Sequence, residues 1–554
     1  MKRRTWRLSS AFVLLFCSGG YAGDENIKPA LNSLNLDEYK SRVETLASDE
    51  FMGRAPATQG EEKTIRYLAE QFKAIGLKPG NGAGYFQDVP MVKITADPAS
   101  FRFAVSGNGQ ALILKFADDF VAGTSRLEET INVRCSDFIF AGYGIVAPEY
   151  DWNDYAGLDV KGKTVFVLVN DPGFATGDNA LFTGKAMTYY GRWTYKFEEA
   201  ARQGAAGVVI IHETEPAGYP YDVVRNGWSG PQFQLDKDGS DMPVCSFQGW
   251  VTQESARKIF ALSGLDYEKE TATAARRGFK AVDLGLKINL SFRNAVEHTL
   301  SHNVVALWPG SDLAGEYVIY MAHWDHFGVN EARPGDKIFN GAVDNATGTA
   351  ALLQLAEAFT RLPQRQRRSI LFVAVTGEEQ GLLGSAFYAG HPLFPLNKTA
   401  GAINMDAFNI FGKMKDITVV GFGMSELDDL AGEIIQRYGR YVVPDPTPEK
   451  GGYFRSDHFS LAKAGLPSLY ISKGVDSVEH GRQWGLDQAE KWTREHYHQP
   501  SDEYRPDLWN FEGMMDDLKI YFEVGYALSM TGKFPNWREG TPYKAARDEM
   551  MGRK

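Results

Sequence analysis

Several apolar segments in the C-terminal half of the chain predict buried β-strands. Apolar residues on both faces of a strand are typical of a parallel sheet that helices cover on each side. The expected strands are Asn303–Leu307, Tyr317–Ala322, Ser369–Val375, Gly401–Met405, Ile417–Gly421 and Ser468–Ile471. Between them, Asn345 can cap a helix that places Leu352, Leu355 and Phe359 on one face. This alternation predicts an α/β fold with a mostly parallel, mixed sheet, and ligand sites in such sheets lie at the carboxyl ends of the strands.

The N-terminal half predicts a helix and then a separate unit. In Glu61–Ile75 the apolar residues recur with the spacing of one helix face, and Gly76 ends the helix. Farther on we expect a helix at Tyr195–Gln203 and strands at Asp137–Val146, Lys163–Val169, Ala206–Ile211 and Met242–Phe247. Residues 116–290 are therefore expected to form a β-rich α/β domain inserted into a domain made of residues 35–115 and 291–535. Residues 536–554 are polar and are expected to form a surface tail.

The first 22 residues have the three parts of a secretory signal peptide. Met1–Arg7 is basic, Leu8–Cys17 is mostly apolar, and Gly20-Tyr21-Ala22 places small residues at a cleavage site. An apolar stretch of about ten residues is too short for a bilayer, which takes about 20. We therefore expect cleavage near Ala22 and a periplasmic or secreted protein without a membrane span.

Composition and charge narrow the possible partners. With 44% hydrophobic and 23% charged residues the chain is an ordinary globular protein. The formal charge is −11, and removing the first 22 residues, which hold four basic groups and no acid, leaves −15. Such a charge disfavours nucleic acids and anionic membranes as partners. The two cysteines of the mature chain, Cys135 and Cys245, could form one disulfide or stay as thiols, and neither the pairing nor the oligomeric state follows from the sequence.

Histidines and acids gather where the predicted strands end. Nine of the ten histidines lie between His298 and His498. The candidates that follow a strand, precede a helix or lie near the end of the chain are His323, Asp325, Asp344, Glu378, Glu379, Asp406 and His498. Because buried carboxylates need a compensating cation, their convergence predicts a metal site. Two divalent ions balance three carboxylates and one hydroxide when His323 and His498 are neutral, so the charges favour two zinc ions over one.

The same residues can be divided by role. A carboxylate can bridge two ions about 3.5–4 Å apart and an imidazole cannot, so one acid must be the bridge. If the strand continues through Glu378 and Glu379, they point in different directions; one is then a ligand and the other a general base. Asp325 is placed to accept the second N–H of His323 and fix its tautomer. The other histidines nearby are expected to be structural or to line the substrate site: His326, His458, His480 and His496.

These motifs resemble the two-zinc aminopeptidases, a family that includes bacterial leucyl aminopeptidases and glutamate carboxypeptidases. The matching strings, in the same order, are Ala322-His-Trp-Asp325, Gly341-Ala-Val-Asp-Asn-Ala-Thr-Gly348, Gly377-Glu-Glu-Gln-Gly-Leu-Leu-Gly-Ser385, Asn404-Met-Asp406 and Tyr497-His498. The resemblance implies a zinc exopeptidase fold in which the ligands and catalytic groups have these roles: His323 and Asp406 on one zinc, Glu379 and His498 on the other, Asp344 bridging, Glu378 as general base, and Tyr497 stabilising the oxyanion. Residues 116–290 resemble a protease-associated domain at Gly142-Tyr-Gly-Ile145, Asp154-Tyr-Ala-Gly-Leu-Asp159 and Gly162-Lys163.

The function that we expect is an exported zinc-dependent exopeptidase, with an aminopeptidase as the first choice. It would remove N-terminal residues from peptides through a metal-bridging hydroxide with Glu378 as general base; manganese or cobalt could occupy the same site. A carboxypeptidase or dipeptidase of the same family is the nearer alternative. It needs a cationic side chain for the terminal carboxylate, and Arg455 is a candidate. A receptor-like binding protein on the same scaffold is the alternative from another class, but it would be expected to lose ligands.

Overall fold

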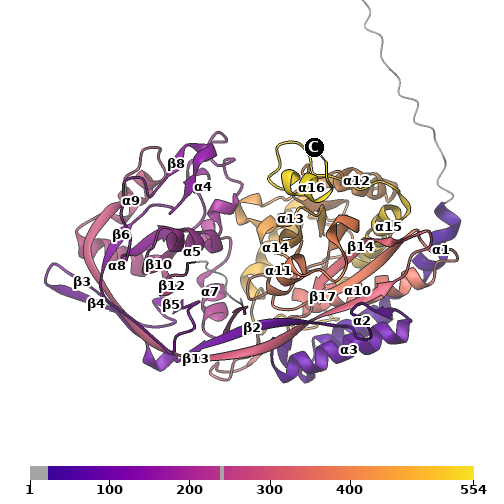
Figure 1. Cartoon of the computed structure of the whole chain (residues 1–554), viewed down its shortest axis with the longest axis horizontal. Coiled ribbons are helices and arrows are strands. Elements are labelled where there is room, and N and C mark those ends of the chain that lie inside the picture. Colours follow the sequence, from indigo (N-terminus) through magenta and orange to yellow (C-terminus); the bar gives the residue numbers. More distant parts are fainter. Residues whose placement is uncertain (1–22, 237–242, 554) are drawn as a thin grey trace, which may run out of the picture.

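The chain folds into two lobes joined by long strands. The computed structural model describes residues 23–236 and 243–553, so the expected signal peptide lies outside the described residues. Strand β13 (Val282–Trp308) is 27 residues long and runs beneath both lobes, beside β2 (Phe86–Ala96) (Figure 1). Residues 97–293 form what we call the second lobe, and most of the remaining described residues form the C-terminal lobe.

A mixed, mostly parallel sheet forms the centre of the C-terminal lobe. Strand β14 (Leu313–His323) lies between β17 (Arg368–Val375) and β18 (Thr399–Asn404) and is parallel to both. The sheet continues from β18 to β21 (Ser468–Ser472), β19 (Asp416–Val420) and β20 (Tyr441–Pro444), and β13 closes its other side next to β17. Five of the six predicted strands are present within a few residues, and the sixth, Asn303–Leu307, is the end of the much longer β13. Together they confirm the predicted fold class.

Helices cover both faces of this sheet, as the two-sided apolar pattern predicts. Alternate strand residues such as Tyr320 and Phe372 belong to one buried cluster, while their neighbours Met321 and Val373 belong to another. The helices of the first face are α1 (Gly23–Ser33), α2 (Leu36–Leu46), α3 (Gln59–Ile75), α10 (Thr347–Thr360), α12 (Leu427–Arg437) and α15 (Glu512–Met530). Those of the other face are α11 (Leu383–Gly390) and α13 (His458–Lys463). A further helix, α14 (Arg482–Glu495), precedes the last candidate histidine.

Helix α3 shows how local sequence sets these elements. Thr58 accepts a hydrogen bond from the amide of Gly60 at the start, and Gly76 ends the helix with φ 94°. Ile65, Leu68 and Phe72 are buried between these ends. A left-handed residue after a helix favours glycine, so the predicted C-terminal end is confirmed.

The second lobe has a sheet of its own. Its parallel strands are β9 (Thr164–Leu168), β10 (Gly207–His212) and β12 (Phe247–Thr252), and it also contains β3 (Arg102–Gly107), β4 (Gln110–Leu114), β5 (Phe120–Gly123) and β6 (Thr130–Phe140). Its helices are α4 (Pro172–Thr176), α5 (Trp193–Arg202), α6 (Thr214–Ala217), α7 (Tyr221–Trp228), α8 (Gln253–Ser263) and α9 (Tyr267–Ala274). Short strands complete the chain at β1 (Lys78–Pro79), β7 (Val146–Ala147), β8 (Trp152–Asn153), β11 (Gln232–Leu235), β15 (Gly328–Val329) and β16 (Ile338–Phe339).

Several expected boundaries differ from the structure. Strands β3 and β4 precede residue 116 but belong to the second sheet, and the expected boundary after residue 290 falls within β13. The strand expected at Asp137–Val146 ends at Phe140, because Gly142 and Gly144 adopt positive φ and turn the chain. The strand expected at Met242–Phe247 is wrong for its described part: β12 starts only at Phe247.

The polar C-terminal segment packs against the fold rather than lying along the surface. Helix α16 (Lys544–Met550) contains the buried Arg547, which donates to the carbonyl of Thr399 at 3.0 Å. The buried indole of Trp537 donates to the carbonyl of Gly465 at 2.9 Å. The segment's polar composition hid these two anchors, so the expected surface tail is corrected.

Two remaining expectations concern the cysteines and the membrane. Cys135 is exposed, Cys245 is buried, and both are free thiols. Across residues 23–236 and 243–553, every helix is too short or too polar to cross a bilayer.

Candidate metal centre

The carboxyl ends of three adjacent strands bring the candidate residues together. His323 is the last residue of β14, and the loop after β17 carries Glu378 and Glu379. Asp406 follows β18 by two residues, and Asp344 precedes α10. The sheet order places these ends side by side, which is how residues far apart in the chain share one site.

Two sets of donor atoms meet at Asp344. Its Oδ1 lies 3.4 Å from Nε2 of His323, and the same nitrogen lies 3.4 Å from Oδ1 of Asp406. Its Oδ2 lies 3.4 Å from Nε2 of His498, which in turn lies 3.0 Å from Oε2 of Glu379. The two oxygens of one carboxylate therefore face two different imidazoles.

These separations fit the spacing of ligands around zinc. Ligands at about 2.1 Å in tetrahedral geometry are about 3.4 Å from one another. Two triads that contain these residues, His323 with Asp344 and Asp406, and His326 with Asp344 and Glu379, offer donor atoms within 4.8 Å of one another. Mixed imidazole and carboxylate donors suit zinc. The residues present thus fit a pair of metal ions that share Asp344.

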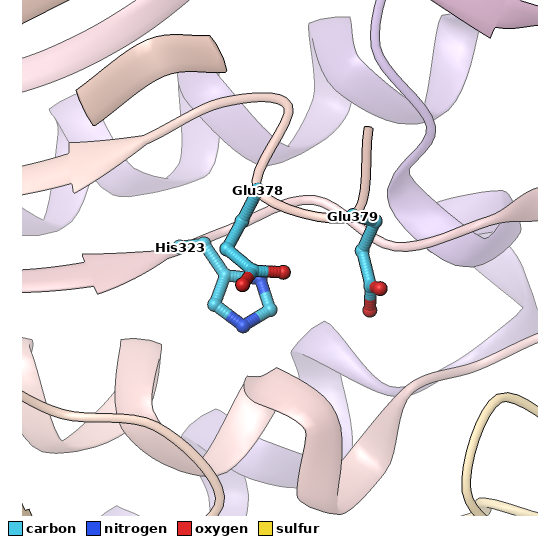
Figure 2. Close-up of side chains that lie close together, drawn as sticks. All are labelled: His323, Glu378 and Glu379. Atoms are coloured by element: carbon cyan, nitrogen blue, oxygen red, sulfur yellow. The ribbon is translucent and has the colours of Figure 1, made fainter. Parts of the chain in front are cut away.

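The loop with the two glutamates differs from the extended strand that we expected. Strand β17 ends at Val375, and Gly377 with φ 62° turns the chain before Glu378. Both glutamate side chains extend to the same side of the loop, where His323 lies (Figure 2), and the three offer donor atoms within 4.8 Å of one another. Alternation along a strand is therefore the wrong reason to give them different roles. Their contacts distinguish the two glutamates instead, because Oε2 of Glu379 lies 3.0 Å from Nε2 of His498.

Asp325 anchors this loop. Its Oδ1 accepts the amide of Glu378 at 3.1 Å, and its Oδ2 accepts the amide of Glu379 at 3.4 Å. We expected the carboxylate of Asp325 to accept the second N–H of His323. Instead, Nδ1 of His323 is 3.2 Å from the main-chain carbonyl of Asp325 and 3.8 Å from its carboxylate. The main chain thus holds the imidazole tautomer, while the carboxylate positions both glutamates.

The pKa values show a surplus of buried negative charge. Burial would lower the pKa of His498, but Glu379 and Asp344 raise it to about 9. Burial likewise opposes protonation of His323, yet the carboxylates of Glu378, Asp344 and Asp406 hold its pKa well above the usual range. Burial raises the pKa of Glu378 well above normal, and Glu379 adds to this. The acids thus favour positive charge at the imidazoles, which is the charge that divalent cations would supply.

Four further residues support the site, and sequence reasoning gave none of them this role. His326 Nδ1 lies 2.5 Å from Oε1 of Glu379, although we expected a structural or substrate-lining histidine. The Ser456 hydroxyl donates to Oδ2 of Asp406 at 2.6 Å. Each contact orients a candidate ligand through its second carboxylate oxygen. The other oxygen of Glu379 faces His498, and the other oxygen of Asp406 faces His323. The sequence His323-Trp-Asp-His326 could have indicated a role for His326 at the site, because it places a second histidine close to a candidate ligand. No motif of this kind marks Ser456.

The other two supports hold the loops that carry ligands. Asp502 accepts the amides of Val343 and Asp344, each at 3.0 Å. Buried Arg54 donates to the carbonyls of Trp324 and Gly341, each at 2.8 Å. A cation from the N-terminal segment thereby joins the loop after β14 to the loop before α10.

The remaining histidines lie apart from the two donor sets. His458 is fully buried, and within the described ranges neither of its ring nitrogens has a hydrogen-bond partner. His480 packs on Trp484 with ring centres 4.5 Å apart, and His496 Nδ1 is 3.0 Å from the hydroxyl of Ser501. Their contacts agree with the structural roles that we expected.

A cavity between the lobes opens onto the site. Glu378, Glu379, Tyr497 and His498 form part of its wall on one side, and helices α5 and α7 with their flanking residues contribute to the other. The Tyr497 ring lies on His498 with centres 3.7 Å apart. Burial, together with the charge of Asp344, raises the pKa of Tyr497 well above normal, so its hydroxyl keeps its proton and can donate.

Comparison with known proteins identifies this part of the chain. Residues 303–521 match the sequence profile of peptidase family M28. This segment is an M28 peptidase domain. All the candidate ligands, Glu378 and Tyr497 lie inside the M28 domain, while Arg54 and the second lobe lie outside it.

Two relatives cover parts of the chain. Aminopeptidase NAALADL1 of Mus musculus is 33% identical over 127 residues, which are 22% of this chain and 16% of the mouse protein. A probable glutamate carboxypeptidase, AMP1 of Arabidopsis thaliana, is 27% identical over 319 residues, which are 50% of this chain and 42% of the plant protein. The chain thus spans less than half the length of either relative.

A solved structure is similar over nearly the whole chain. An aminopeptidase from Aneurinibacillus sp. strain AM-1 superposes with a TM-score of 0.54 at 18% identity, covering 92% of this chain and 97% of that one. At this identity the similarity establishes the fold, so the two-lobed arrangement around the M28 domain has a solved counterpart.

Proposed function

We propose that this protein is a zinc-dependent exopeptidase that is exported from the cell, and that it acts as an aminopeptidase. The observation that carries the proposal is the placement of Asp344, whose two oxygens face separate imidazoles. One zinc would be held by His323, Asp344 and Asp406, and a second by Asp344, Glu379 and His498. The names of relatives, an aminopeptidase and a probable carboxypeptidase, support an exopeptidase.

The protein's own residues would move the proton. Zinc ions, when bound, polarise a carbonyl and lower the pKa of a neighbouring water molecule. Glu378 lies beside the donor sets without being needed in either, and its raised pKa makes it a stronger base than an exposed carboxylate. In the proposed reaction Glu378 accepts a proton from water and passes it to the leaving amine.

Two neighbours would assist Glu378. Asp325 holds the amides of Glu378 and Glu379, and so fixes the base relative to the ligand beside it. The protonated hydroxyl of Tyr497 would donate to the oxyanion that develops on the substrate carbonyl. The carbonyl of His498, next to Tyr497, accepts a hydrogen bond from Asn226 of α7 at 3.1 Å. The second lobe therefore contacts this part of the cavity wall directly.

Export and the nature of the second lobe are parts of the same proposal. The basic, apolar and small-residue segments of residues 1–22 support cleavage near Ala22 and a periplasmic or secreted enzyme. The assignment of the second lobe as a protease-associated domain stays a prediction from its motifs. Peptides are the expected substrates.

A carboxypeptidase or dipeptidase is the second candidate, because Arg455 lines the same cavity. Dipeptides with a free or a blocked amino group separate the two functions. An aminopeptidase cleaves only the free form, since its site must receive the terminal amine. Cleavage of the blocked form at a similar rate would favour the carboxypeptidase.

The role of Glu378 gives the decisive variant. We expect Glu378→Gln to lower kcat by about 10²–10⁴-fold while the bound metal is retained. Glu490→Gln, the same change on an exposed position of α14, should behave as wild type. Loss of metal from Glu378→Gln would instead make Glu378 a ligand, and wild-type turnover would exclude it as the base.

A further inference from the structure

His498 has a backbone conformation that few residues of its kind adopt. Its φ is 56°, in the left-handed region that is uncommon for residues other than glycine. Such a conformation costs free energy and persists only where the surrounding structure holds it. The contacts on the main chain of His498 therefore decide whether its imidazole stays in the donor set.

Helix α7 of the second lobe supplies one of these contacts. It lies on the side of that lobe that faces the C-terminal lobe (Figure 1), and Nδ2 of Asn226 donates to the carbonyl of His498 at 3.1 Å. The other side of the Asn226 amide, Oδ1, lies 3.4 Å from Nη1 of Arg333. Nη2 of Arg333 also reaches Oε1 of Gln499 at 3.5 Å. Because an asparagine amide has an acceptor on one side and a donor on the other, Arg333 turns the donor of Asn226 toward His498.

The other ligand in the same donor set is also supported by the second lobe. Gln380 directly follows Glu379, and its Oε1 accepts the amide of Phe233 in β11 at 3.2 Å. Strand β11 follows α7 directly in the chain. One short segment, residues 226–233, therefore contacts both loops that carry the ligands of one proposed ion.

The ligands of the other proposed ion are supported from within the C-terminal lobe. The Ser456 hydroxyl donates to Asp406 at 2.6 Å, and Nδ1 of His323 lies 3.2 Å from the carbonyl of Asp325. The Thr349 hydroxyl donates to the carbonyl of His323 at 2.8 Å. The two donor sets thus differ in the lobe that positions them.

We propose that Asn226 and the amide of Phe233 position His498 and Glu379, so that the second lobe sets the affinity of one of the two metal ions. The inference rests on the two-ion centre of the proposed function. Asn226 and Gln380 are positioning residues, because they act on the loops of the ligands. Removing a partner that orients a ligand typically lowers metal affinity by about 10- to 100-fold. Docking of the two lobes and binding of this ion are then coupled.

Zinc titration of the metal-free full chain, by calorimetry with a competing chelator, tests the role of Asn226. Asn226→Ala should weaken one ion by about 10- to 100-fold and leave the other within about threefold of wild type. Asn226→Asp should weaken the same ion, because a carboxylate has the size of the amide but cannot donate to the carbonyl of His498. Arg225→Ala is the matched control one position earlier in α7, where the side chain is exposed and pairs with Asp222 at 2.7 Å. Its two zinc affinities should equal those of wild type.

Position 380 needs the opposite chemistry. Gln380→Ala removes the acceptor of the Phe233 amide and should weaken the same ion as Asn226→Ala does. Gln380→Glu keeps an acceptor oxygen at this place and should retain both ions. The affinity of the other ion, measured in the same titration, shows that each variant is folded.

A crystal structure of Asn226→Ala, at a zinc concentration between its two dissociation constants, identifies the weakened ion. We expect one anomalous peak, beside His323 and Asp406. Unchanged zinc affinities in Asn226→Ala, equal weakening of both ions, or a remaining peak beside Glu379 would overturn the inference while wild type still binds two ions and cleaves peptides. A wild type that binds fewer than two ions would contradict the proposed metal centre itself, and the inference with it.

Discussion

Both lobes contain buried parallel strands with ionisable groups near their carboxyl ends, but the two groups differ in how much negative charge the protein leaves uncompensated. In the second lobe, buried Lys196 donates to the carbonyls of Tyr143 and Asn170 at 2.6 and 2.8 Å, and Asp171 and Asp154 act on it as counter-charges. In that group the protein itself supplies a cation, one lysine for two carboxylates. In the C-terminal lobe, carboxylates outnumber the nearby cations, so the protein cannot balance the group without adding positive charge.

Two histidines show the same difference. Burial lowers the pKa of His212 in the second lobe to about 4; its Nε2 lies 3.1 Å from the carbonyl of Tyr219, and its ring packs among the aromatic rings of Tyr219, Tyr221 and Trp250. His498 is also buried, yet two carboxylates raise its pKa to about 9. A buried histidine is therefore weak evidence of a metal site by itself. The surplus of carboxylate around it is what marks the site.

The largest effect should come from the bridging acid. Asp344→Asn keeps the shape but leaves one good acceptor oxygen, so we expect both ions to be lost and activity to fall at least about 10³-fold. Asp171→Asn is the counterpart in the second lobe and should keep metal and activity even if it lowers stability. Elemental analysis and kcat/KM of both variants make the comparison. Equal metal loss in the two would show that general unfolding, not the bridge, was responsible.

The two histidines give the next contrast. His498→Ala should remove one ion and reduce kcat/KM at least about 10²-fold, because one donor set loses its imidazole. His212→Ala should retain the metal and lose about 1–3 kcal/mol of stability, because the carbonyl of Tyr219 loses its buried partner. Metal content, activity and thermal unfolding are measured together. Retention of both ions by His498→Ala would contradict its place in the second set.

Asp325→Asn should have a smaller effect. Its carboxylate positions Glu378 and Glu379 through their amides, so we expect kcat to fall by about 10- to 100-fold with KM little changed. The measurement is a kcat and KM pair at fixed zinc concentration. A change in KM alone would assign Asp325 to substrate binding.

The pH dependence of the metal-free protein should reveal the opposite shifts. His498 has a folded pKa of about 9, above its unfolded value of about 6.5, so its contribution is complete below pH 6.5 and is lost as the pH rises through 9. His212 has a folded pKa of about 4, so its contribution is present above pH 6.5 and is lost as the pH falls through 4. The thermal midpoint of the metal-free wild type should fall as the pH rises from 6.5 to 9. In His498→Ala the fall should be smaller. An equal fall in both proteins would place its cause elsewhere.

The smallest effect concerns the thiols. Because Cys135 and Cys245 are both free, Cys135→Ser and added reductant should leave the thermal midpoint unchanged. Thiol titration of the unfolded chain without Cys17 should give two groups before and after reduction. A midpoint that drops on reduction would indicate a disulfide.

The sequence predicted the C-terminal sheet well because its strands are continuous apolar runs. The positions after those runs then located His323, Glu378 and Asp406 at one edge of the sheet. The structure brings these residues together with Asp344 and His498, as the sequence reasoning expected. Only the resemblance to two-zinc aminopeptidases divided them between two ions.

Other features depend on contacts that leave no local pattern. Arg54 reaches carbonyls of two distant loops, and Ser456 meets Asp406 through a loop turn. Gly377 has a positive φ that stops β17 before the glutamates, which the apolar run could not reveal. Tertiary packing decides each of these points.

The most direct test of the central claim is a crystal structure of the zinc-loaded protein with anomalous scattering measured at the zinc edge. The account predicts two peaks about 3.5–4 Å apart, one bonded to His323 and Asp406, the other to Glu379 and His498, with one oxygen of Asp344 on each. A single peak, or two peaks of which only one touches Asp344, would contradict it.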